Sequence, residues 1–365
     1  MAKYGIGQAI TRREDLRLLL GTGQYVDDMA LPGETHIVFV RSPHAHARIT
    51  SIDTSAAKGM PGVLAVYTGA DLQADGVGAL PIGPGLVRGD GEPMDGPPNN
   101  PLAVDTARYV GEAVAAVIAQ SRIQAQDAAE HVQVDYEELP AVVTIDQAKA
   151  KDAPQIWPGA PGNIAAQTEF GSKDDTDAGF GKAKHVTKLS LHNQRLVPVT
   201  MEPRGSIGDF DEKTGRVILW TSCQNPSGLK DTLADAVLKI PKEQVRVRVG
   251  DVGGGFGMKT QLYPEDCVCA YAARKLKKPV HWRATRSEEF LVGNHGRDQS
   301  SRAELAFDAD GKILGLRLEI DGSIGAHANG PGAVIVVAVG PKVITGVYDI
   351  PALHLRGNAY LTNTN

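Results

Sequence analysis

A run of glycines interrupted by one phenylalanine is the segment of this chain best suited to bind a ligand. Gly253, Gly254, Gly255 and Gly257 surround Phe256. Glycine tolerates positive φ and leaves the backbone uncovered, so a bound group can reach main-chain N–H groups directly. We expect the phenylalanine to form one wall of a pocket. A simple turn between two elements is the alternative interpretation, because glycine most often marks turns.

Neither of the common phosphate-binding motifs fits this segment. A P-loop requires glycine directly before lysine, whereas Met258 separates Gly257 from Lys259. The dinucleotide fingerprint requires glycine at its first, third and sixth positions, and counting from Gly253 places Met258 at the sixth. Counting from the neighbouring glycines fails as well. The sequence therefore gives no support to a nucleotide-binding role for this run.

Four further polar segments surround the glycine run in a fixed order along the chain. They are 193–204 (NQRLVPVTMEPR), 221–226 (TSCQNP), 263–266 (YPED) and 294–298 (NHGRD). Together with the glycine run, this order resembles the molybdenum-binding large subunit of the xanthine dehydrogenase, aldehyde oxidase and carbon monoxide dehydrogenase family. The resemblance runs from Arg13 to Asn365. It implies an α+β fold in which an N-terminal α/β hammerhead-type domain precedes the first molybdopterin-binding domain.

The resemblance also implies a reaction class. Family members are hydroxylases that oxidise a carbon centre, for example in an aldehyde or an N-heterocycle, with oxygen taken from water. Their cofactor is molybdenum bound to molybdopterin, here expected in the cytosine dinucleotide form, and iron–sulfur and FAD partner subunits receive the electrons. The family holds this cofactor by hydrogen bonds, so we expect no side chain that ligates molybdenum directly. Carbon monoxide is a further substrate class that the sequence leaves open.

The resemblance places five residues of this chain at the cofactor, namely Gln224, Gly254, Gly255, Phe256 and Gly257. Gln224 matches a glutamine whose amide donates to an oxo ligand of molybdenum. Phe256 and Gly257 match a pair that lies against the metal centre. Preorganised N–H groups suit an oxygen-rich centre, because they donate to it at little reorganisation cost. A polar turn residue is the alternative interpretation of Gln224.

Other polar residues are expected around this site. Thr260 occupies the position at which purine-oxidising members have a glutamate, so we expect it in the substrate pocket and expect xanthine to be disfavoured. Glu202 and Arg204 predict an ion pair that braces the wall of the site, with a catalytic role as the alternative. His295, Arg297 and Asp298 predict supporting contacts, with direct substrate contact as the alternative.

The family pattern continues beyond Asn365 into further cofactor-binding segments and the glutamate proposed as catalytic base. We therefore expect no catalytic residue in this chain, and a C-terminal half that completes the molybdenum subunit. A natural split subunit and a truncated reading frame both fit this expectation. A second class of function also stays open: a non-catalytic assembly or interaction module that keeps the fold without the cofactor. The unbroken glycine run favours the enzyme, because a scaffold has no need for an exposed backbone cradle.

Composition and charge agree with part of a large enzyme. The 365 residues are 42% hydrophobic and 22% charged, which suffices for two or more domains with sizeable cores. The net charge of −5 and the scattered basic residues argue against nucleic-acid binding. No apolar run reaches the roughly 18 residues of a membrane span, and the N-terminus lacks a signal-peptide core. We expect a cytoplasmic location, with periplasmic export through a partner's signal as the alternative.

Neither the cysteines nor two neighbouring histidines predict a metal site. An odd number of cysteines argues against a disulfide framework, and an iron–sulfur cluster needs more thiolates than Cys223, Cys267 and Cys269 supply. Cys267 and Cys269 fall in a helical pattern, where we expect them to be buried. His44 and His46 have no third ligand nearby in sequence, so we expect no metal site there.

The pattern of apolar residues predicts which elements carry these groups. Alternating valines from Val245 predict a strand that ends at about Gly250. A long loop is expected over 76–100, which is rich in glycine and proline. The remaining predictions are strands at 35–41, 110–119, 132–136 and 185–191, a helix capped by Ser121, a strand pair within 206–221, helical spacing over 226–238, and a hairpin within 303–320. We place the domain boundary near residue 150, giving a hammerhead-type domain at 1–150 and an incomplete molybdopterin-binding domain at 151–365.

Overall fold

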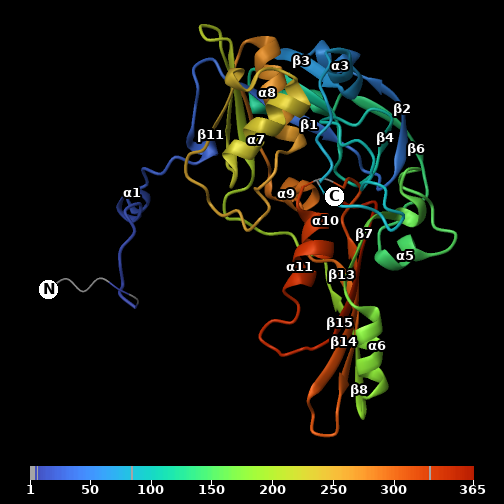
Figure 1. Ribbon diagram of the computed structural model, residues 1–365. Helices are drawn as coiled ribbons and strands as arrows, with labels where there is room; N and C mark the ends of the chain where they lie inside the picture. Colours follow the sequence, from blue (N-terminus) through green and yellow to red (C-terminus); the bar gives the residue numbers. More distant parts are fainter. Residues whose placement is uncertain (1–4, 6, 84, 329) are drawn as a thin grey trace.

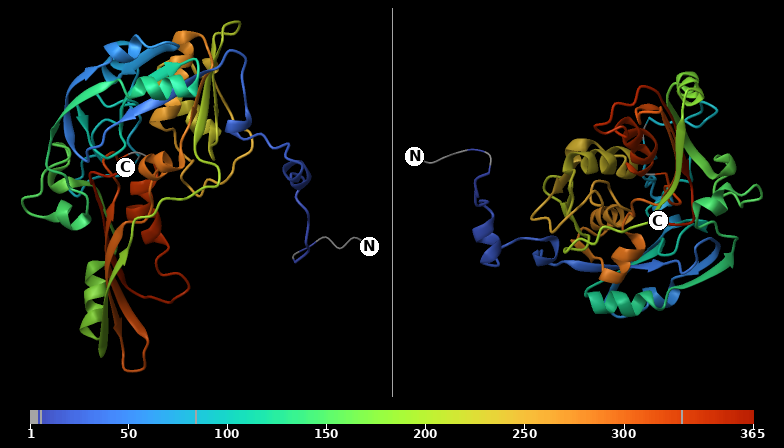
Figure 2. Two further views of the ribbon diagram at one scale, coloured as in Figure 1. Left: turned by 180° about the vertical axis from the view of Figure 1, so that it is seen from behind. Right: turned by 90° about the horizontal axis from the view of Figure 1, so that it is seen from below.

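The computed structural model describes residues 5, 7–83, 85–328 and 330–365. Figure 1 shows a broad upper part, a long narrow sheet that projects below it, and an N-terminal arm that extends away from both. The arm carries the short helix α1 (Asp15–Leu19), while the C-terminus lies where the upper and lower parts meet. The two further views in Figure 2 show the same arrangement from behind and from below.

A seven-stranded mixed sheet forms the centre of the upper part. Its strand order is β11 (Val245–Arg248), β10 (Arg216–Thr221), β9 (Gly205–Asp211), β12 (Val280–Arg283), β1 (Thr35–Arg41), β5 (Ala113–Ala119) and β3 (Val63–Thr68). The pairs β10·β11 and β1·β12 are parallel, and the other four pairs are antiparallel. In β10 the burial of side chains alternates along the strand, as expected where only one face of the sheet is covered.

Helices cover both faces of this sheet because successive side chains of a strand point to opposite faces. Ala116 and Ile118 of β5 pack in one core with α8 (Pro264–Leu276). Ala115 and Val117 pack in another core with α4 (Arg122–Ala129). Strand β5, buried at every residue, is therefore the layer shared by the two cores.

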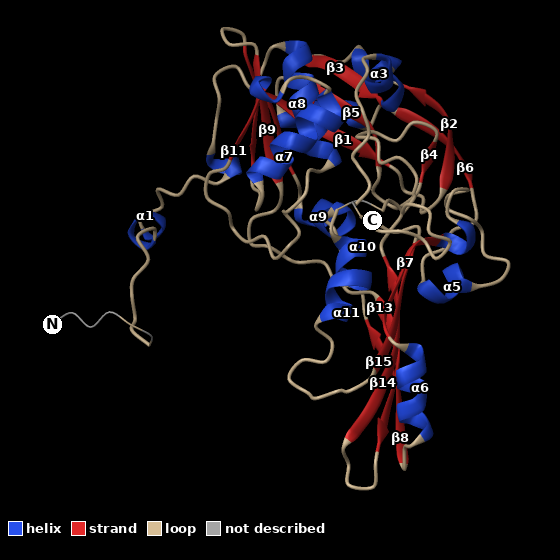
Figure 3. Cartoon of the chain, viewed as in Figure 1, coloured by secondary structure: helices blue, strands red, loops and turns tan. Residues whose placement is uncertain are grey.

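Two smaller sheets complete the strands. The three-stranded sheet has the order β4 (Thr106–Ala107), β2 (Ala47–Asp53) and β6 (Gln133–Glu138). The five-stranded sheet has the order β7 (Ile164–Gly171), β15 (Leu353–Tyr360), β14 (Ile313–Ser323), β13 (Gln299–Phe307) and β8 (His185–Asn193), and it forms the narrow lower part coloured red in Figure 3. Its edge strand β8 is exposed at all nine residues.

The remaining helical segments are short connectors. They are η1 (Val26–Asp28), α2 (Ser55–Lys58), α3 (Gly69–Ala74), α5 (Ile145–Lys149), η2 (Pro161–Asn163), α6 (Lys173–Gly181), α7 (Pro226–Thr232), η3 (Leu233–Leu238), η4 (Lys242–Gln244), α9 (Arg286–Val292), α10 (Gly332–Val334), η5 (Ile335–Val339) and α11 (Gly340–Lys342). Helix α6 runs along the lower sheet, and η5 packs Val336 and Val337 into the core of that sheet.

The structure confirms the expected α+β fold and most of the expected elements. The Ser121 hydroxyl accepts a hydrogen bond from the Gln124 amide at the start of α4, as a helix cap should. The strand predicted from residue 110 begins only at Ala113, because Gly111 has φ +99° and forms a turn. Residues 85–100 contain no helix or strand beyond isolated bridges, in agreement with the expected loop.

One sheet draws strands from both sides of residue 150. Strands β1, β3 and β5 precede that position, and β9 to β12 follow it. The only link between the two groups within this sheet is the parallel pairing of β1 with β12, which joins Thr35 to Val280 and His36 to His281 among the described residues. The boundary near residue 150 thus stays a prediction about domain organisation, because the two sequence regions share one sheet.

Candidate functional site

The glycine-rich loop connects the end of β11 to the start of α8. Gly254 and Gly257 adopt φ values of +101° and +90°, which favour glycine. Met258 donates its backbone N–H to the carbonyl oxygen of Gly255 at 2.9 Å, which closes a turn within the loop. The segment is therefore a strand that ends in a compact glycine-dependent loop, as the valine alternation and the glycines predicted.

Gln224 lies directly against this loop. Its side-chain oxygen accepts hydrogen bonds from the backbone N–H groups of Gly257 at 3.0 Å and Lys259 at 3.3 Å. Its own backbone N–H donates to the carbonyl oxygen of Lys259 at 2.7 Å. A Cβ atom on Gly255 would lie only 2.4 Å from the Gln224 side-chain oxygen. The glycine at position 255 is therefore needed for the close approach of the two segments.

The contact leaves several hydrogen-bond donors without protein partners. Among the described residues, the backbone N–H groups of Gly254, Gly255 and Phe256 donate no hydrogen bond. The amide nitrogen of Gln224 is likewise unpaired within the described part, because only its oxygen contacts the loop. This donor-rich surface fits a group rich in oxygen atoms. The Phe256 side chain is 77% exposed, so its role as a pocket wall stays a prediction.

A buried ion pair between Lys259 and Glu202 stabilises the glycine-rich loop. Lys259 is 1% exposed, and its ammonium group donates to Glu202 Oε2 at 3.0 Å and to Ser222 Oγ at 2.8 Å. The same Glu202 oxygen accepts the backbone N–H of Gly253 at 2.8 Å. Burial lowers the pKa of Lys259, while Glu202 acts in the opposite direction. The pair joins the glycine run to the segment that carries Gln224.

Arg204 belongs to a second buried network, which corrects the expected Glu202–Arg204 ion pair. Arg204 donates to Glu265 at 3.2 Å and to Glu289 at 3.2 Å, and its guanidinium lies 3.7 Å from the ring centre of Tyr263. Burial alone would lower the pKa of Arg204, but the negative charges of Glu265 and Glu289 outweigh this effect and raise it. Glu202 and Arg204 of the Met-Glu-Pro-Arg motif therefore have different partners, Lys259 for the glutamate and two other glutamates for the arginine.

His295 and Asp298 meet around a common partner that the sequence did not suggest. Arg195 donates to His295 Nδ1 at 2.7 Å and to Asp298 at 3.2 Å, and it also contacts Asn365. Burial and the neighbouring arginine lower the pKa of His295 to about 4. The two residues thus support this arginine, in line with the predicted supporting role.

Thr260 and the cysteines occupy structural positions. The Thr260 hydroxyl donates to the carbonyl oxygen of Gly257 at 2.8 Å and so closes the loop. Cys267 and Cys269 lie in α8 and are completely buried, as predicted, and burial raises the pKa of both thiols. Cys223 is also buried, which raises its pKa to about 11.

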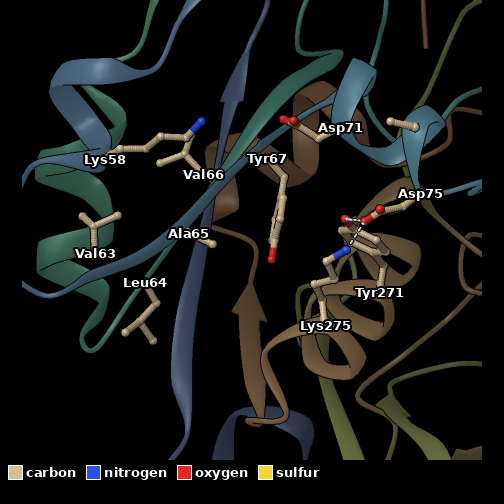
Figure 4. Close-up of a pocket in the computed structure, with 11 residues that line it drawn as sticks. Lys58, Val63, Leu64, Ala65, Val66, Tyr67, Asp71, Asp75, Tyr271 and Lys275 are labelled. Carbon is tan, nitrogen blue, oxygen red and sulfur yellow. Dashed lines mark hydrogen bonds and ion pairs between the residues drawn. The ribbon is translucent and has the colours of Figure 1, made fainter.

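A cavity of about 490 Å³ lies elsewhere, between β3, α3 and α8. Figure 4 shows Tyr271 and Lys275 of α8 directed toward Asp75, to which they donate at 2.5 Å and 2.7 Å. These residues lie two and three turns into α8, whereas the glycine-rich loop precedes its first residue. The cavity is therefore separate from the donor-rich surface.

The sequence singled out Glu202 and Gln224, but not their partners Lys259 and Ser222 or the glutamates that hold Arg204. Lys259 entered only as a mismatch to the P-loop, and Ser222 lacked any pattern of its own. Glu265 and Glu289 each stand in the first turn of a helix, which is also where exposed glutamates are common. Burial of these groups depends on contacts between distant segments, so no local signal could identify them.

None of the helices in the described part of the chain has the length and apolar character of a membrane span.

Comparisons with known proteins agree with the two-part organisation. Residues 20–140 match the model of the aldehyde oxidase and xanthine dehydrogenase a/b hammerhead domain, and residues 156–365 match that of the molybdopterin cofactor-binding domain. The chain is 37% identical to the nicotine 6-hydroxylase large subunit of Paenarthrobacter nicotinovorans, over 98% of this chain and 43% of that protein. It is 36% identical to the carbon monoxide dehydrogenase large chain of Afipia carboxidovorans, over 98% of this chain and 44% of that protein.

Solved structures show the same likeness. Quinoline 2-oxidoreductase from Pseudomonas putida superposes with a TM-score of 0.91 at 37% identity, over 100% of this chain and 45% of that one. Carbon monoxide dehydrogenase from Oligotropha carboxidovorans superposes with a TM-score of 0.87 at 34% identity, over 99% and 45%. The chain thus spans less than half the length of these relatives. It belongs to the aldehyde oxidase and xanthine dehydrogenase family and carries that family's hammerhead and molybdopterin cofactor-binding domains.

Proposed function

We propose that this chain forms the N-terminal part of a molybdenum hydroxylase large subunit that oxidises a carbon centre with oxygen from water. The observation that carries the proposal is the contact between Gln224 and the glycine-rich loop. In the part of the chain that the structure describes, the N–H groups of Gly254, Gly255 and Phe256 and the amide nitrogen of Gln224 have no protein partner at this contact. Such a cluster of fixed donors supports binding of an oxygen-rich cofactor.

When bound, the molybdenum–molybdopterin cofactor supplies the two-electron oxidation of the substrate carbon. The residues of this chain bind and orient that cofactor. Gln224 donates through its amide nitrogen, while its oxygen keeps the loop in position. Gly254 and Gly255 leave their backbone N–H groups open to the cofactor, Gly257 allows it to approach because it has no side chain, and Phe256 lies against it. No side chain of the described residues is assigned to molybdenum as a ligand or to the substrate as a catalytic base.

The finer features of the proposal follow from the family. We propose the cytosine dinucleotide form of the cofactor, and partner subunits that carry iron–sulfur clusters and FAD. We also propose a cytoplasmic location. Aldehydes and N-heterocycles are the proposed substrates, and the relatives named for nicotine and quinoline support the second class. Thr260 would face the substrate and would disfavour purines, because a hydroxyl cannot replace the charged contact of a glutamate.

A C-terminal half is proposed to cover the donor-rich surface. Met201 directly precedes Glu202, and Phe256 stands three residues before Lys259. The two residues are 89% and 77% exposed. Their segments meet at Gly254, where an added Cβ atom would lie 3.0 Å from the Phe256 ring and 3.4 Å from Thr200, the neighbour of Met201. Large apolar side chains exposed together mark surfaces that another protein segment covers. The relatives are more than twice as long as the matched region, which supports a second half of this kind.

The rival function is a non-catalytic assembly or interaction module that keeps the fold without the cofactor. The two functions separate in one experiment on the complex purified from its native host. Turnover of aldehydes and N-heterocycles would be assayed in isotope-labelled water. We expect the label in the hydroxylated product, because oxygen would come from water. Unlabelled product would contradict water as the oxygen source, whereas no turnover together with no bound molybdenum would favour the rival function.

A further inference from the structure

A second group of ligand-type side chains lies where β1 meets β12. Glu34 directly precedes β1, His36 lies near the start of β1, and His281 lies near the start of β12. One oxygen or nitrogen atom of each residue lies within 4.8 Å of the others. Glu34 Oε1 is 3.6 Å from His281 Nδ1 and 3.9 Å from His36 Nε2.

The strand register brings these residues together. His36 and His281 are direct partners in the parallel pairing of β1 with β12, so their side chains leave the sheet on the same face. Their rings stack with centres 5.9 Å apart and planes at 26°. Glu34 stands two residues before His36, which places it on that face as well. The pairing of β1 with β12 therefore positions the two histidines of the cluster.

His281 shows an unusual lack of hydrogen bonds. Its side chain is 8% exposed, yet neither ring nitrogen has a partner among the described residues. The 3.6 Å separation from Glu34 is too long for a hydrogen bond. Buried polar atoms are nearly always paired, so an unpaired imidazole at a cluster of ligand-type groups needs an explanation.

The other groups are arranged to receive a cation. Glu34 Oε2 accepts the backbone N–H of Leu31 at 3.0 Å, which leaves Oε1 directed at the two rings. Two ligands at about 2.1 Å from a tetrahedral zinc ion lie about 3.4 Å apart, close to the separations between Glu34 and the two imidazoles. A cavity of about 290 Å³ opens on the cluster, also lined by Asp27, Arg122 and Arg283. This cavity leaves room for water beside a bound ion.

We propose that Glu34, His36 and His281 bind a zinc-type divalent cation. Imidazole and carboxylate ligands suit zinc, and three protein ligands leave one position for water.

The position of the cluster suggests a structural role for the ion. Within the seven-stranded sheet, β1 and β12 share only two register pairs among the described residues, fewer than any other pair of neighbouring strands. That pairing is also the one that joins the N-terminal strands to the later ones. An ion held by Glu34 and His36 on one side and His281 on the other would cross-link this junction and stabilise the folded chain.

The test measures zinc binding to the full chain, purified with whatever partners remain bound to it. Zn²⁺ would be titrated by calorimetry, and Co²⁺ would be added separately to record its visible absorption. The variants are Glu34→Gln and His36→Gln, both at partly exposed positions that should tolerate substitution, and His281→Gln. His131→Gln is the matched control, because its ring is exposed and bonds only to the Asp127 carbonyl oxygen.

We expect wild type and His131→Gln to bind stoichiometric Zn²⁺, to show a tetrahedral Co²⁺ spectrum and to gain thermal stability on adding zinc. Loss of one ligand should weaken binding at least about tenfold and abolish the gain in stability. Equal zinc affinity in His36→Gln and His131→Gln would overturn the proposal, as would a wild-type chain that binds no Zn²⁺. Molybdenum content should stay the same in wild type, Glu34→Gln and His36→Gln, which separates this site from the glycine-rich loop.

Discussion

The ammonium nitrogen of Lys259 lies 3.0 Å from a carboxylate oxygen of Glu202, and the lysine side chain has no exposure to solvent. Its remaining hydrogen bonds go to Ser222 Oγ at 2.8 Å and to the Glu202 carbonyl oxygen at 2.9 Å. All three ammonium hydrogens thus have acceptors. Because Ser222 stands two residues before Gln224 and Lys259 two residues after Gly257, the pair fixes the two halves of the proposed cofactor surface to each other.

Removal of the carboxylate should destabilise the chain strongly. Glu202→Ala would leave the buried Lys259 charge without its partner, which we expect to cost about 3–5 kcal/mol in unfolding free energy. Urea unfolding of the purified chain measures this loss. The control is Glu212→Ala, whose ion pair with Lys277 is 60% exposed on both sides and should contribute less than about 1 kcal/mol. Similar losses of unfolding free energy in both variants would show that the buried Glu202–Lys259 pair stabilises the chain no more than an exposed ion pair does.

Gln224 should have two separable roles. Gln224→Glu keeps an oxygen that can accept from the Gly257 and Lys259 N–H groups, but it removes the amide donors and adds a negative charge. We expect a fold close to wild type with turnover reduced by about a hundredfold, because a fixed donor to the reacting centre is lost. Gln224→Ala should lose both roles. The matched control is Gln73→Glu at an exposed position of α3, and unchanged turnover in Gln224→Glu would contradict the proposed donation.

Gly257 should be required for cofactor binding as well as for its backbone conformation. A Cβ atom at Gly257 meets no protein atom within 4 Å, and the same holds for Gly215 in the turn between β9 and β10. Both residues have positive φ, so a valine at either position should cost about 1–3 kcal/mol from backbone strain. We expect Gly257→Val, but not Gly215→Val, to lose molybdenum. Normal molybdenum content in Gly257→Val would show that the cofactor does not approach this position.

The contact between Arg195 and His295 predicts a loss of stability in mild acid. Burial and Arg195 lower the pKa of His295 from about 6.5 to about 4 in the folded chain. Between these values the unfolded chain binds a proton that the folded chain excludes. Unfolding free energy should therefore fall as pH drops from about 6.5 to about 4, by an amount on the order of 3 kcal/mol. Unfolding curves of wild type, His295→Gln and the His131→Gln control measure this, and an equal acid response in all three would contradict it.

Thr260→Glu should widen the substrate range toward purines. The new carboxylate would occupy the position that the purine-oxidising members use to hold their substrate. Thr260→Val is the matched control, because both variants lose the hydrogen bond from the Thr260 hydroxyl to the Gly257 carbonyl oxygen. Xanthine turnover by the complete enzyme is the measurement. Equal xanthine activity in the two variants would show that Thr260 lies outside the substrate pocket.

Local patterns predicted most of the elements and the position of the glycine-rich loop. The alternating valines of β11 and the helical spacing around Cys267 depend on neighbours in sequence, so the chain itself displays them. The family resemblance placed Gln224 and Gly257 at the same cofactor, but their direct contact was not predicted, because no local rule joins two loops. The partners of Glu202 and the register of His36 with His281 depend on how distant strands align. Neither could be read from residue spacing.

The central claim is that Gln224 and the glycine-rich loop hold a molybdenum cofactor. The most direct test is the molybdenum content of the complex purified from its native host, measured by elemental analysis beside the Gln224→Ala and Gly257→Val variants. We predict stoichiometric molybdenum in the wild-type complex, with a bound C-terminal half, and a clear reduction in both variants. A wild-type complex without molybdenum, or variants that retain all of it, would contradict the claim.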